Sequence, residues 1–206
     1  KPELEYFLGY TGSNGYLLLL SQKDFLFFTD GRYFEAYKNQ FLENIIKIEG
    51  GVKIYETIAK ILKEKNFSRL YVNPNDITFS QALELKKFLK PLSLRKDAFS
   101  VANIRKIKTY EEVKKIKQSI AIADEGLAYL IAWLKEGVTE KQAATELEYY
   151  LKLKGAEELS FSSIVLFGEN TAYPHGEPGN RSLKEGDVVL VDLGVKKDLY
   201  CSDMTR

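Results

Sequence analysis

The pattern of hydrophobic and polar residues divides the chain near residue 100. In the first part, short apolar runs alternate with stretches that have the periodicity of amphipathic helices. The segment "GYLLLLSQKDFLFFT" (15–29) predicts a β-hairpin, because two apolar runs flank a short polar one. Strands are predicted again at "NIIKIE" and "RLYVN", and helices at 53–65 and 78–89. Strands alternating with helices after a hairpin predict an α/β domain with mixed strand pairing, assigned to residues 1–104.

Three helices of this part have predicted inward faces. Asp30 and Gly31 are expected to turn the chain and cap a short helix. The residues expected to face the interior are Tyr33, Phe34 and Tyr37 in that helix, Ile54, Ile58, Ile61 and Leu62 in the second, and Phe79, Leu83 and Phe88 in the third. Residues 96–108 show no sustained period and are expected to be a linker.

The second part, residues 105–206, begins with two helix signals. Thr109 with Glu112, and Thr139 with Gln142, have the spacing of capping boxes. The first predicts a long amphipathic helix that ends before Gly137, and the second a helix that closes at Gly155. A strand at "LSFSSIVLFG", a loop rich in Pro and Gly over 169–180, and two strands flanking "VKKD" follow.

Composition excludes several classes of function. The 206 residues carry 30 basic and 29 acidic side chains, so no electrostatic footprint for nucleic acid is expected. Cys201 is the single cysteine and His175 the single histidine, which leaves no internal disulfide and no zinc-binding Cys/His cluster. No apolar run is long enough for a membrane span, and the cysteine usage favours a reducing cytoplasm.

Two aspartates, Asp192 and Asp203, interrupt the last two apolar strands. A hairpin with Lys197 and Asp198 as its loop would place these aspartates directly opposite each other, with Cβ atoms roughly 4.5–5.5 Å apart. Carboxylates this close repel unless a cation lies between them, and oxygen donors suit Mn, Mg or Ca. Two metal ions would fit such a pair. The alternative, that the aspartates are solvated or pair with Arg206 or Lys197, stays open on spacing alone.

The residues that carry this pattern also resemble a known family. "SFSSIVLFGENTAYPHGEPGNRSLKEGDVVLVDLGVKKDLYCSDMTR" is similar to the first half of the "pita-bread" metallopeptidases, in particular the Xaa-Pro aminopeptidase and prolidase branch. "YTGSNGYLLL" and "LFFTDGRYFEAY" resemble the creatinase-like N-terminal domain of that branch, and "IRKIKTYEEVKKIKQSIAIADEGL" resembles its interdomain segment. The resemblance implies an α/β (α+β) chain, with a creatinase-like N-terminal domain followed by the first half of a pita-bread catalytic domain.

The resemblance also implies roles for three residues. Asp192 matches the first metal ligand and Asp203 the carboxylate that bridges two metal ions. His175 matches a catalytic histidine that hydrogen-bonds near the scissile carbonyl, although a lone histidine in such a loop is more often simply exposed. The implied cofactor is a pair of divalent ions, most simply Mn, with Co or Zn as alternatives. The implied substrates are proline-containing peptides, and the implied assembly is a homodimer.

Two departures from the family pattern change the expectation. Leu199 stands where the family usually has Gly, so the turn is not expected to adopt the common Asn-Gly or Asp-Gly geometry. The family's remaining ligands, a histidine and two glutamates, have no counterpart here, so the chain is expected to be an inactive fragment. The parent activity is expected to be Xaa-Pro aminopeptidase; prolidase and a non-catalytic binding protein of the same fold are the alternatives.

Other motifs favour structural interpretations. Ser160, Ser162 and Ser163 lack the "GxSxG" context of a nucleophile elbow and are interpreted as strand-edge residues. Arg32, in "FTDGRY", could face a partner subunit, but a turn-and-cap role for this motif is favoured. Trp133 is expected to be a core or interface residue of the long helix.

Overall fold

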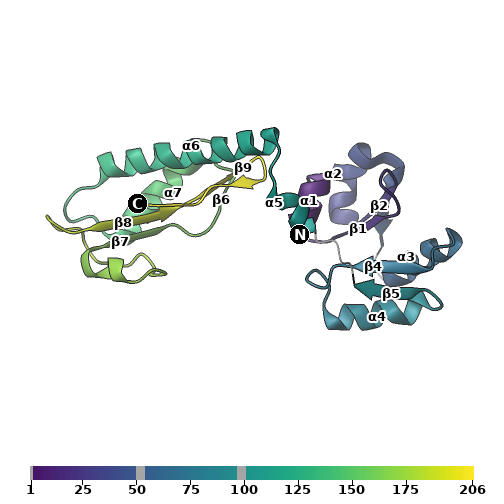
Figure 1. Cartoon of the computed structure of the whole chain (residues 1–206). Coiled ribbons are helices and arrows are strands. Elements are labelled where there is room, and N and C mark those ends of the chain that lie inside the picture. The colour runs from purple at the N-terminus through teal and green to yellow at the C-terminus, as the bar shows by residue number, and fades with distance from the viewer. Residues whose placement is uncertain (1, 50–53, 97–100) are drawn as a thin grey trace. The chain divides into compact units, whose positions relative to one another are not determined.

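The structure is a computed structural model, which describes residues 2–49, 54–96 and 101–206 (Figure 1). The chain divides into two compact units, residues 1–107 and 108–206. Each unit has its own hydrophobic core and is described by itself. Among the described helices, none combines the length and the apolar character that crossing a membrane requires.

The first unit contains two small sheets. Strands β1 (Gly15–Leu19) and β2 (Phe25–Asp30) form the predicted antiparallel hairpin, and β3 (Ile45–Ile48) pairs with β2 in parallel. The predicted mixed pairing is therefore confirmed. A second sheet consists of β4 (Arg69–Val72) and β5 (Ser93–Lys96), which are parallel. The helices of the unit are α1 (Pro2–Leu8), α2 (Gly31–Phe41), η1 (Leu42–Asn44), α3 (Ile54–Glu64), α4 (Phe79–Leu89) and α5 (Val101–Lys106).

Local helix signals in this unit are confirmed. Asp30 is the N-cap of α2, and its Oδ1 accepts a hydrogen bond from the backbone N–H of Arg32 at 3.0 Å. The expected aromatic face of α2 packs against a cluster built around Tyr10 and Phe27. In α3, Ile58 and Leu62 are buried as expected.

The inward face predicted for α4 is confirmed for Phe88, which is half-buried against the core cluster, but it is wrong for Phe79 and Leu83. Phe79 is 80% exposed and Leu83 is 46% exposed, while Leu85 and Leu89 are the buried residues. At 100° per residue, Leu85 and Leu89 lie roughly 120° around the helix from the predicted pair. The sequence supplied two apolar stripes on this helix, and the parallel pair β4–β5 and α3 select the second one. The expected linker also contains structure, since α5 falls within it; residues 97–100 lie outside the described residues.

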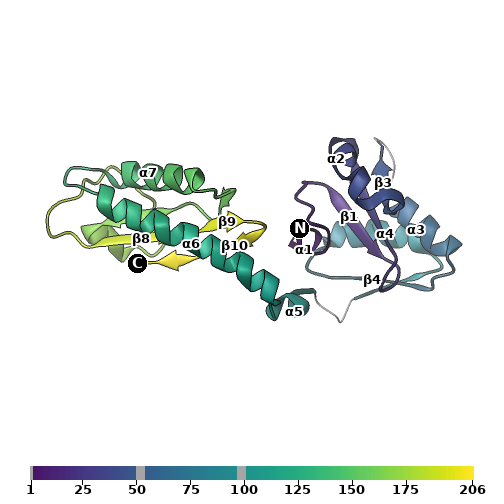
Figure 2. The ribbon, with the colours of Figure 1, turned by 90° about the horizontal axis from the view of Figure 1, so that it is seen from above.

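The second unit begins with two long helices, α6 (Tyr110–Trp133) and α7 (Glu140–Leu153). Both start with the predicted capping boxes, at Thr109 with Glu112 and at Thr139 with Gln142. Gly137 and Gly155 have φ of +88° and +98°, so the breaks predicted there use a backbone conformation that glycine adopts freely. Figures 1 and 2 show α6 and α7 together on one side of the strands.

Each of the three long strands predicted for this unit is divided into two shorter strands, and the three interruptions lie side by side. The predicted strand at 159–168 is β6 (Glu158–Leu159) and β7 (Ile164–Phe167), followed by η2 (Gly168–Ala172). The last two predicted strands are β8 (Val189–Leu193) with β9 (Val195–Lys197), and β10 (Tyr200–Cys201) with β11 (Met204–Thr205). The pairing orders are β10-β9-β6 and β11-β8-β7. A long three-stranded antiparallel ribbon is thus interrupted across its width, at 160–163, Gly194 and 202–203.

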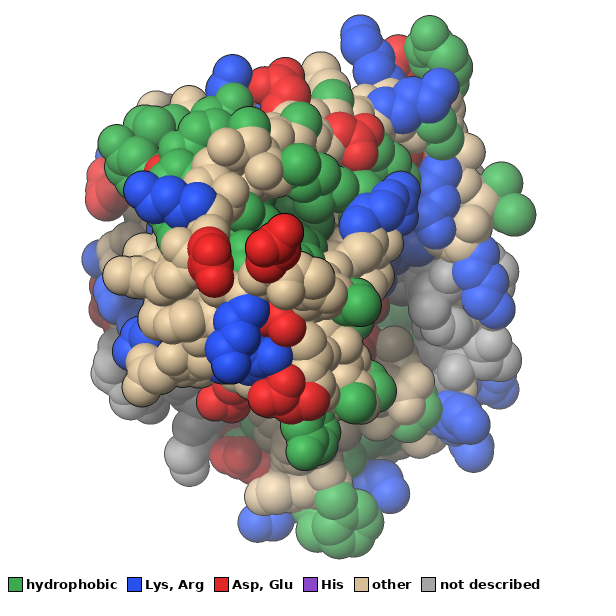
Figure 3. Space-filling model, turned by 90° about the vertical axis from the view of Figure 1, so that its left-hand side faces the viewer, with side chains coloured by type: hydrophobic (Ala, Val, Ile, Leu, Met, Phe, Trp, Pro, Cys, Tyr) green, Lys and Arg blue, Asp and Glu red, His purple; other side chains and the backbone are tan. Residues whose placement is uncertain are grey.

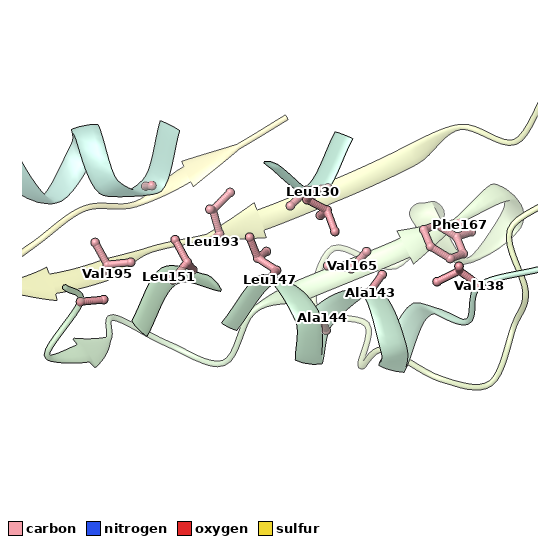
Figure 4. Packing of buried hydrophobic residues seen from close by; sticks show 13 residues of the cluster. Leu130, Val138, Ala143, Ala144, Leu147, Leu151, Val165, Phe167, Leu193 and Val195 are labelled. Atoms are coloured by element: carbon pink, nitrogen blue, oxygen red, sulfur yellow. The ribbon is translucent and has the colours of Figure 1, made fainter. Parts of the chain in front are cut away.

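Alternate residues of the ribbon form the core beneath the two helices (Figure 4). Val165 and Phe167 of β7, Leu193 of β8 and Val195 of β9 pack with Leu147 and other residues of α6 and α7. Side chains alternate between the faces of a strand, so the residues between these core positions lie on the other face. That face of the ribbon, which α6 and α7 do not cover, is called the open face below.

Candidate functional site

The hairpin that carries the two aspartates has a register different from the predicted one. Thr205 pairs with Asp192, and Met204 with Leu193, because the two-residue loop is Asp198–Leu199 rather than Lys197–Asp198. The expectation that Asp192 directly faces Asp203 is therefore wrong. Asp198 and Leu199 have φ of +48° and +69°, the signs that a type I′ turn requires at both central positions. The expectation that Leu199 prevents such a turn is wrong as well.

Asp192 and Asp203 nevertheless share the open face. Asp192 lies between Val191 and Leu193, which both belong to the core cluster. Asp203 lies between Ser202, whose hydroxyl donates to the Ser119 carbonyl of α6, and Met204, which packs against the core. Both aspartates consequently lie on the face opposite the helices, as diagonal rather than direct neighbours.

Thr205 contacts the first aspartate directly. Its hydroxyl donates a hydrogen bond to Asp192 Oδ1 at 2.6 Å. This contact orients the carboxylate, and Thr205 is a residue that the sequence analysis missed. The sequence spacing could have indicated this role, because Thr205 lies two residues after Asp203 and therefore on the same face of an extended strand.

The ion pairs considered as an alternative are not formed by the described residues. Lys197 pairs with Glu157, with Nζ and Oε1 3.1 Å apart. The Arg206 guanidinium donates to the Thr205 carbonyl at 2.8 Å. The described basic side chains therefore form no salt bridge with Asp192 or Asp203; Asp203 is exposed and Asp192 half-buried, so solvent reaches both carboxylates.

The loop that carries His175 covers the same face. Leu166 lies on the open face because its neighbours Val165 and Phe167 are core residues, yet it is only 1% exposed. Gly176 lies against it so closely that an added Cβ would be 2.8 Å from Leu166 Cδ1. In Figure 1 the segment that follows β7 lies below the strands, while α6 lies above them. The loop of His175 therefore covers part of the face that carries Asp192 and Asp203, at Leu166, and the imidazole itself is exposed.

A buried carboxylate fixes this loop, and the sequence analysis missed it. Glu140, at the start of α7, is fully buried. Its Oε1 accepts hydrogen bonds from the Phe167 backbone N–H (2.8 Å) and from Asn170 Nδ2 (2.9 Å). Its Oε2 accepts from the Gly179 backbone N–H at 2.9 Å. One side chain therefore joins α7, the end of β7 and the His175 loop; its position directly after the cap Thr139 gave no signal of this role.

An arginine stabilises the remainder of the segment between β7 and β8. The Arg181 NH2 group donates to Glu169 Oε2 at 2.6 Å and to Asp187 Oδ1 at 3.1 Å. The pKa of Glu169 is lowered by a hydrogen bond from its own backbone N–H and then by Arg181. Gly168 has φ of +49°, and an added Cβ would lie 2.1 Å from the Arg181 NH2 atom. Glycine is therefore required where this segment turns away from β7.

The donor chemistry of the open face suits a divalent cation. Asp192 and Asp203 offer hard carboxylate oxygens, which Mn, Mg and Ca prefer. In the part of the chain that the structure describes, no group of three or more His, Cys, Asp or Glu side chains is arranged to hold a metal ion. Among these residues, Asp192 and Asp203 thus offer two suitable oxygen donors without a third ligand of these types grouped with them.

A hollow of about 600 Å³ on the helix side is separate from this face. It is lined by residues at the end of α6, between the two helices and on α7, including Trp133, Val138 and Glu146. Trp133 also packs against the core, which confirms its predicted structural role. Figure 3, which views the molecule from the end where α6 finishes, shows hydrophobic side chains beside basic and acidic ones. The hollow contains none of the three site residues.

Comparisons with known proteins match both units. Residues 1–105 match the Creatinase/Prolidase N-terminal domain, and residues 114–206 match Metallopeptidase family M24. The whole chain is 33% identical to "Uncharacterized peptidase YqhT" of Bacillus subtilis (strain 168) and covers 58% of that protein. The chain thus spans about half the length of the curated relatives it matches.

Solved structures agree with these matches. An Xaa-Pro dipeptidase from Bacillus anthracis matches 98% of this chain and 56% of its own, with a TM-score of 0.87 and 31% identity. An X-Pro aminopeptidase from Thermotoga maritima matches 99% of this chain and 57% of its own, with a TM-score of 0.89 and 28% identity. The fold, the open face and these matches show that the chain belongs to metallopeptidase family M24, in the branch whose members carry a creatinase/prolidase N-terminal domain.

Proposed function

We propose that the protein is a metal-dependent aminopeptidase that releases the N-terminal residue from peptides with proline in second position. The observation that carries the proposal is the shared open face, where Asp192 and Asp203 are diagonal neighbours and which the loop of His175 contacts at Leu166. The similarity to an X-Pro aminopeptidase over 99% of the chain supports the substrate class. Proline lacks a backbone N–H and restricts the residue before it, so a pocket dedicated to this bond is chemically reasonable.

Asp192 and Asp203 would hold divalent metal in this proposal, with Mn preferred and Co or Zn as alternatives. When bound, a pair of such ions supplies an activated water and neutralises the charge that develops on the cleaved amide. Thr205 orients the Asp192 carboxylate through the 2.6 Å hydrogen bond. His175, exposed above the face, would donate a hydrogen bond to the oxygen of the scissile carbonyl.

The 206-residue chain by itself is expected to bind metal weakly and to show no peptidase turnover. Two carboxylates are a small part of the ligands that a two-metal centre needs. Clear turnover by the pure chain would contradict this expectation.

A prolidase, which cleaves only Xaa-Pro dipeptides, is the second candidate. The similarity to the Bacillus anthracis Xaa-Pro dipeptidase, at 31% identity, favours it. Rates on an Xaa-Pro-Xaa tripeptide and on the matching Xaa-Pro dipeptide separate the two activities. Faster cleavage of the tripeptide supports the aminopeptidase, and cleavage of the dipeptide alone supports the prolidase.

The proposed chemistry is tested with the gene product that contains this chain. The protein is stripped with a chelator, its metal content is measured, and Mn²⁺ is restored before both peptides are assayed. Loss of turnover on chelation and recovery with Mn²⁺ are the expected results. A protein that carries no transition metal after gentle purification and cleaves neither peptide would instead be a non-catalytic member of the family.

A further inference from the structure

The hydrogen-bond ladder between β9 and β10 changes partners directly before Asp203. The Ser202 backbone N–H donates to the Val195 carbonyl at 2.9 Å, as a regular antiparallel pair requires. The return bond is different, because the Val195 N–H donates to the Ser202 hydroxyl oxygen at 3.1 Å. Ser202 is buried, and its side chain thus takes the place that its own carbonyl has in a regular ladder.

The displaced Ser202 carbonyl has a new partner on the third strand of the ribbon. The Ser160 hydroxyl, between β6 and β7, donates to the Ser202 carbonyl at 2.8 Å. The Ser160 backbone N–H donates to the Gly194 carbonyl at 2.9 Å, so Ser160 joins both neighbouring breaks. At Gly194 an added Cβ would lie 2.3 Å from the Ser202 carbonyl oxygen, which leaves room there only for glycine. The three breaks are therefore one connected structure.

The Ser202 carbonyl belongs to the peptide bond that leads into Asp203, so whatever fixes this carbonyl fixes the orientation of the Asp203 backbone. We infer that Ser160 is a positioning residue for the candidate metal site: its hydroxyl holds the Ser202–Asp203 peptide in the turned orientation that presents the Asp203 carboxylate beside Asp192. The inference rests on the proposed function and extends it to a residue on a different strand. It also gives the Ser160 hydroxyl a partner other than a substrate.

The chain offers a matched control for Ser160. Ser163 lies in the same segment and is buried, and its hydroxyl has no hydrogen-bond partner among the described residues. Ser160→Ala and Ser163→Ala thus remove the same atom from neighbouring positions, but only the first removes a hydrogen bond to the Asp203 peptide. Ser160→Thr keeps a hydroxyl and serves as the conservative rescue.

The experiment uses the ¹⁵N-labelled 206-residue chain and two readouts that need no peptidase activity. Amide residual dipolar couplings report the orientation of the Asp203 N–H bond, and line broadening during Mn²⁺ titration reports metal affinity at Asp192 and Asp203. In Ser160→Ala we expect a changed Asp203 coupling and a Mn²⁺ dissociation constant raised about tenfold, as for the loss of other partners of metal ligands. Ser163→Ala and Ser160→Thr are expected to match the wild type, and circular dichroism melts check that each variant is folded.

The outcomes separate the inference from the proposed function. An unchanged Asp203 coupling together with an unchanged Mn²⁺ dissociation constant in folded Ser160→Ala would overturn the inference. An equal effect of Ser163→Ala would also overturn it, because the effect would then not depend on the hydrogen bond. Absence of Mn²⁺ broadening in the wild type counts against the metal role of the aspartates, and the dipolar couplings still decide whether Ser160 sets the Asp203 orientation.

Discussion

Asp192 pairs with Thr205 across β8 and β11, and the Thr205 hydroxyl donates to Asp192 Oδ1 at 2.6 Å. The partner of the first candidate ligand is therefore a hydroxyl rather than the second carboxylate. This register keeps Asp203 on the same face but moves it to a diagonal position, which reduces the repulsion that direct opposition would cause.

Replacing Thr205 with Val is expected to weaken metal binding without unfolding the chain. Val has nearly the shape of Thr and suits a strand, but it cannot donate to Asp192. The loss of a hydrogen bond to a metal ligand typically costs 10–100-fold in affinity, so we expect the Mn²⁺ dissociation constant to rise by at least about tenfold. Calorimetric titration of the gene product measures it. Thr205→Ser, which keeps the hydroxyl, is the control, and equal affinities for the Val and Ser variants would contradict the assigned contact.

Gly194→Ala is expected to destabilise the second unit. The added Cβ would lie 2.3 Å from the Ser202 carbonyl oxygen, a backbone atom that cannot move without disturbing the ribbon. Overpacking of this kind costs about 1–3 kcal/mol in the free energy of unfolding, which urea denaturation measures. Gly31→Ala is the control, because its nearest contact is the Lys47 side chain at an ordinary 3.4 Å. Equal stability of Gly194→Ala and the wild type would contradict the tight contact.

Glu140→Gln is expected to loosen the His175 loop. Glutamine retains one acceptor oxygen, so it cannot accept the hydrogen bonds of Phe167, Asn170 and Gly179 together. Leaving a buried N–H without a partner costs about 1–3 kcal/mol. The melting temperature measures this loss, and the single imidazole signal in the proton spectrum reports the His175 environment. The exposed Glu136→Gln is the control; a Glu140→Gln variant with an unchanged melting temperature and imidazole signal would contradict the role.

The first unit has a pH-dependent stabilising contact at Asp30. Hydrogen bonds from the Arg32 side chain, followed by one from Asn14, hold the pKa of Asp30 well below its usual value of 3.8. A carboxylate whose pKa is lower in the folded state than in the unfolded state stabilises the fold at pH values above the unfolded-state pKa. This stabilisation is lost as the pH falls from the unfolded-state pKa towards the folded-state pKa. Asp30→Asn should therefore lower the melting temperature at pH 7 more than at pH 2. An equal or larger effect at pH 2 would contradict the assigned cause.

The features that could be predicted best from the sequence are those that contacts between neighbouring residues determine. The capping boxes at Thr109 and Thr139 and the cap at Asp30 are made within one helical turn, so neighbouring residues suffice to predict them. The face of α4 was predicted correctly for Phe88 but wrongly for Phe79 and Leu83, because two apolar stripes compete on that helix and packing against distant elements decides between Leu83 and Leu85.

The candidate site was predicted in its residues but not in its geometry. Asp192 and Asp203 were identified, yet a one-residue error in the turn changed the partner of each. Leu199 at φ of +69° gave no turn signal, because a branched side chain rarely adopts that conformation. The contacts of Glu140 and of Ser160 join segments 27 to 42 residues apart, and no local pattern encodes such pairs.

The proposed function requires Asp192 and Asp203 to act together as metal ligands. The most direct test measures metal content and the rate on an Xaa-Pro-Xaa peptide for the gene product with Asp203→Asn, beside Asp198→Asn in the nearby turn. Asp203→Asn is expected to lose bound metal and at least about 100-fold in kcat/KM, while Asp198→Asn is expected to keep both. An Asp203→Asn variant that retains the metal content and the rate of the wild type would contradict the proposed function.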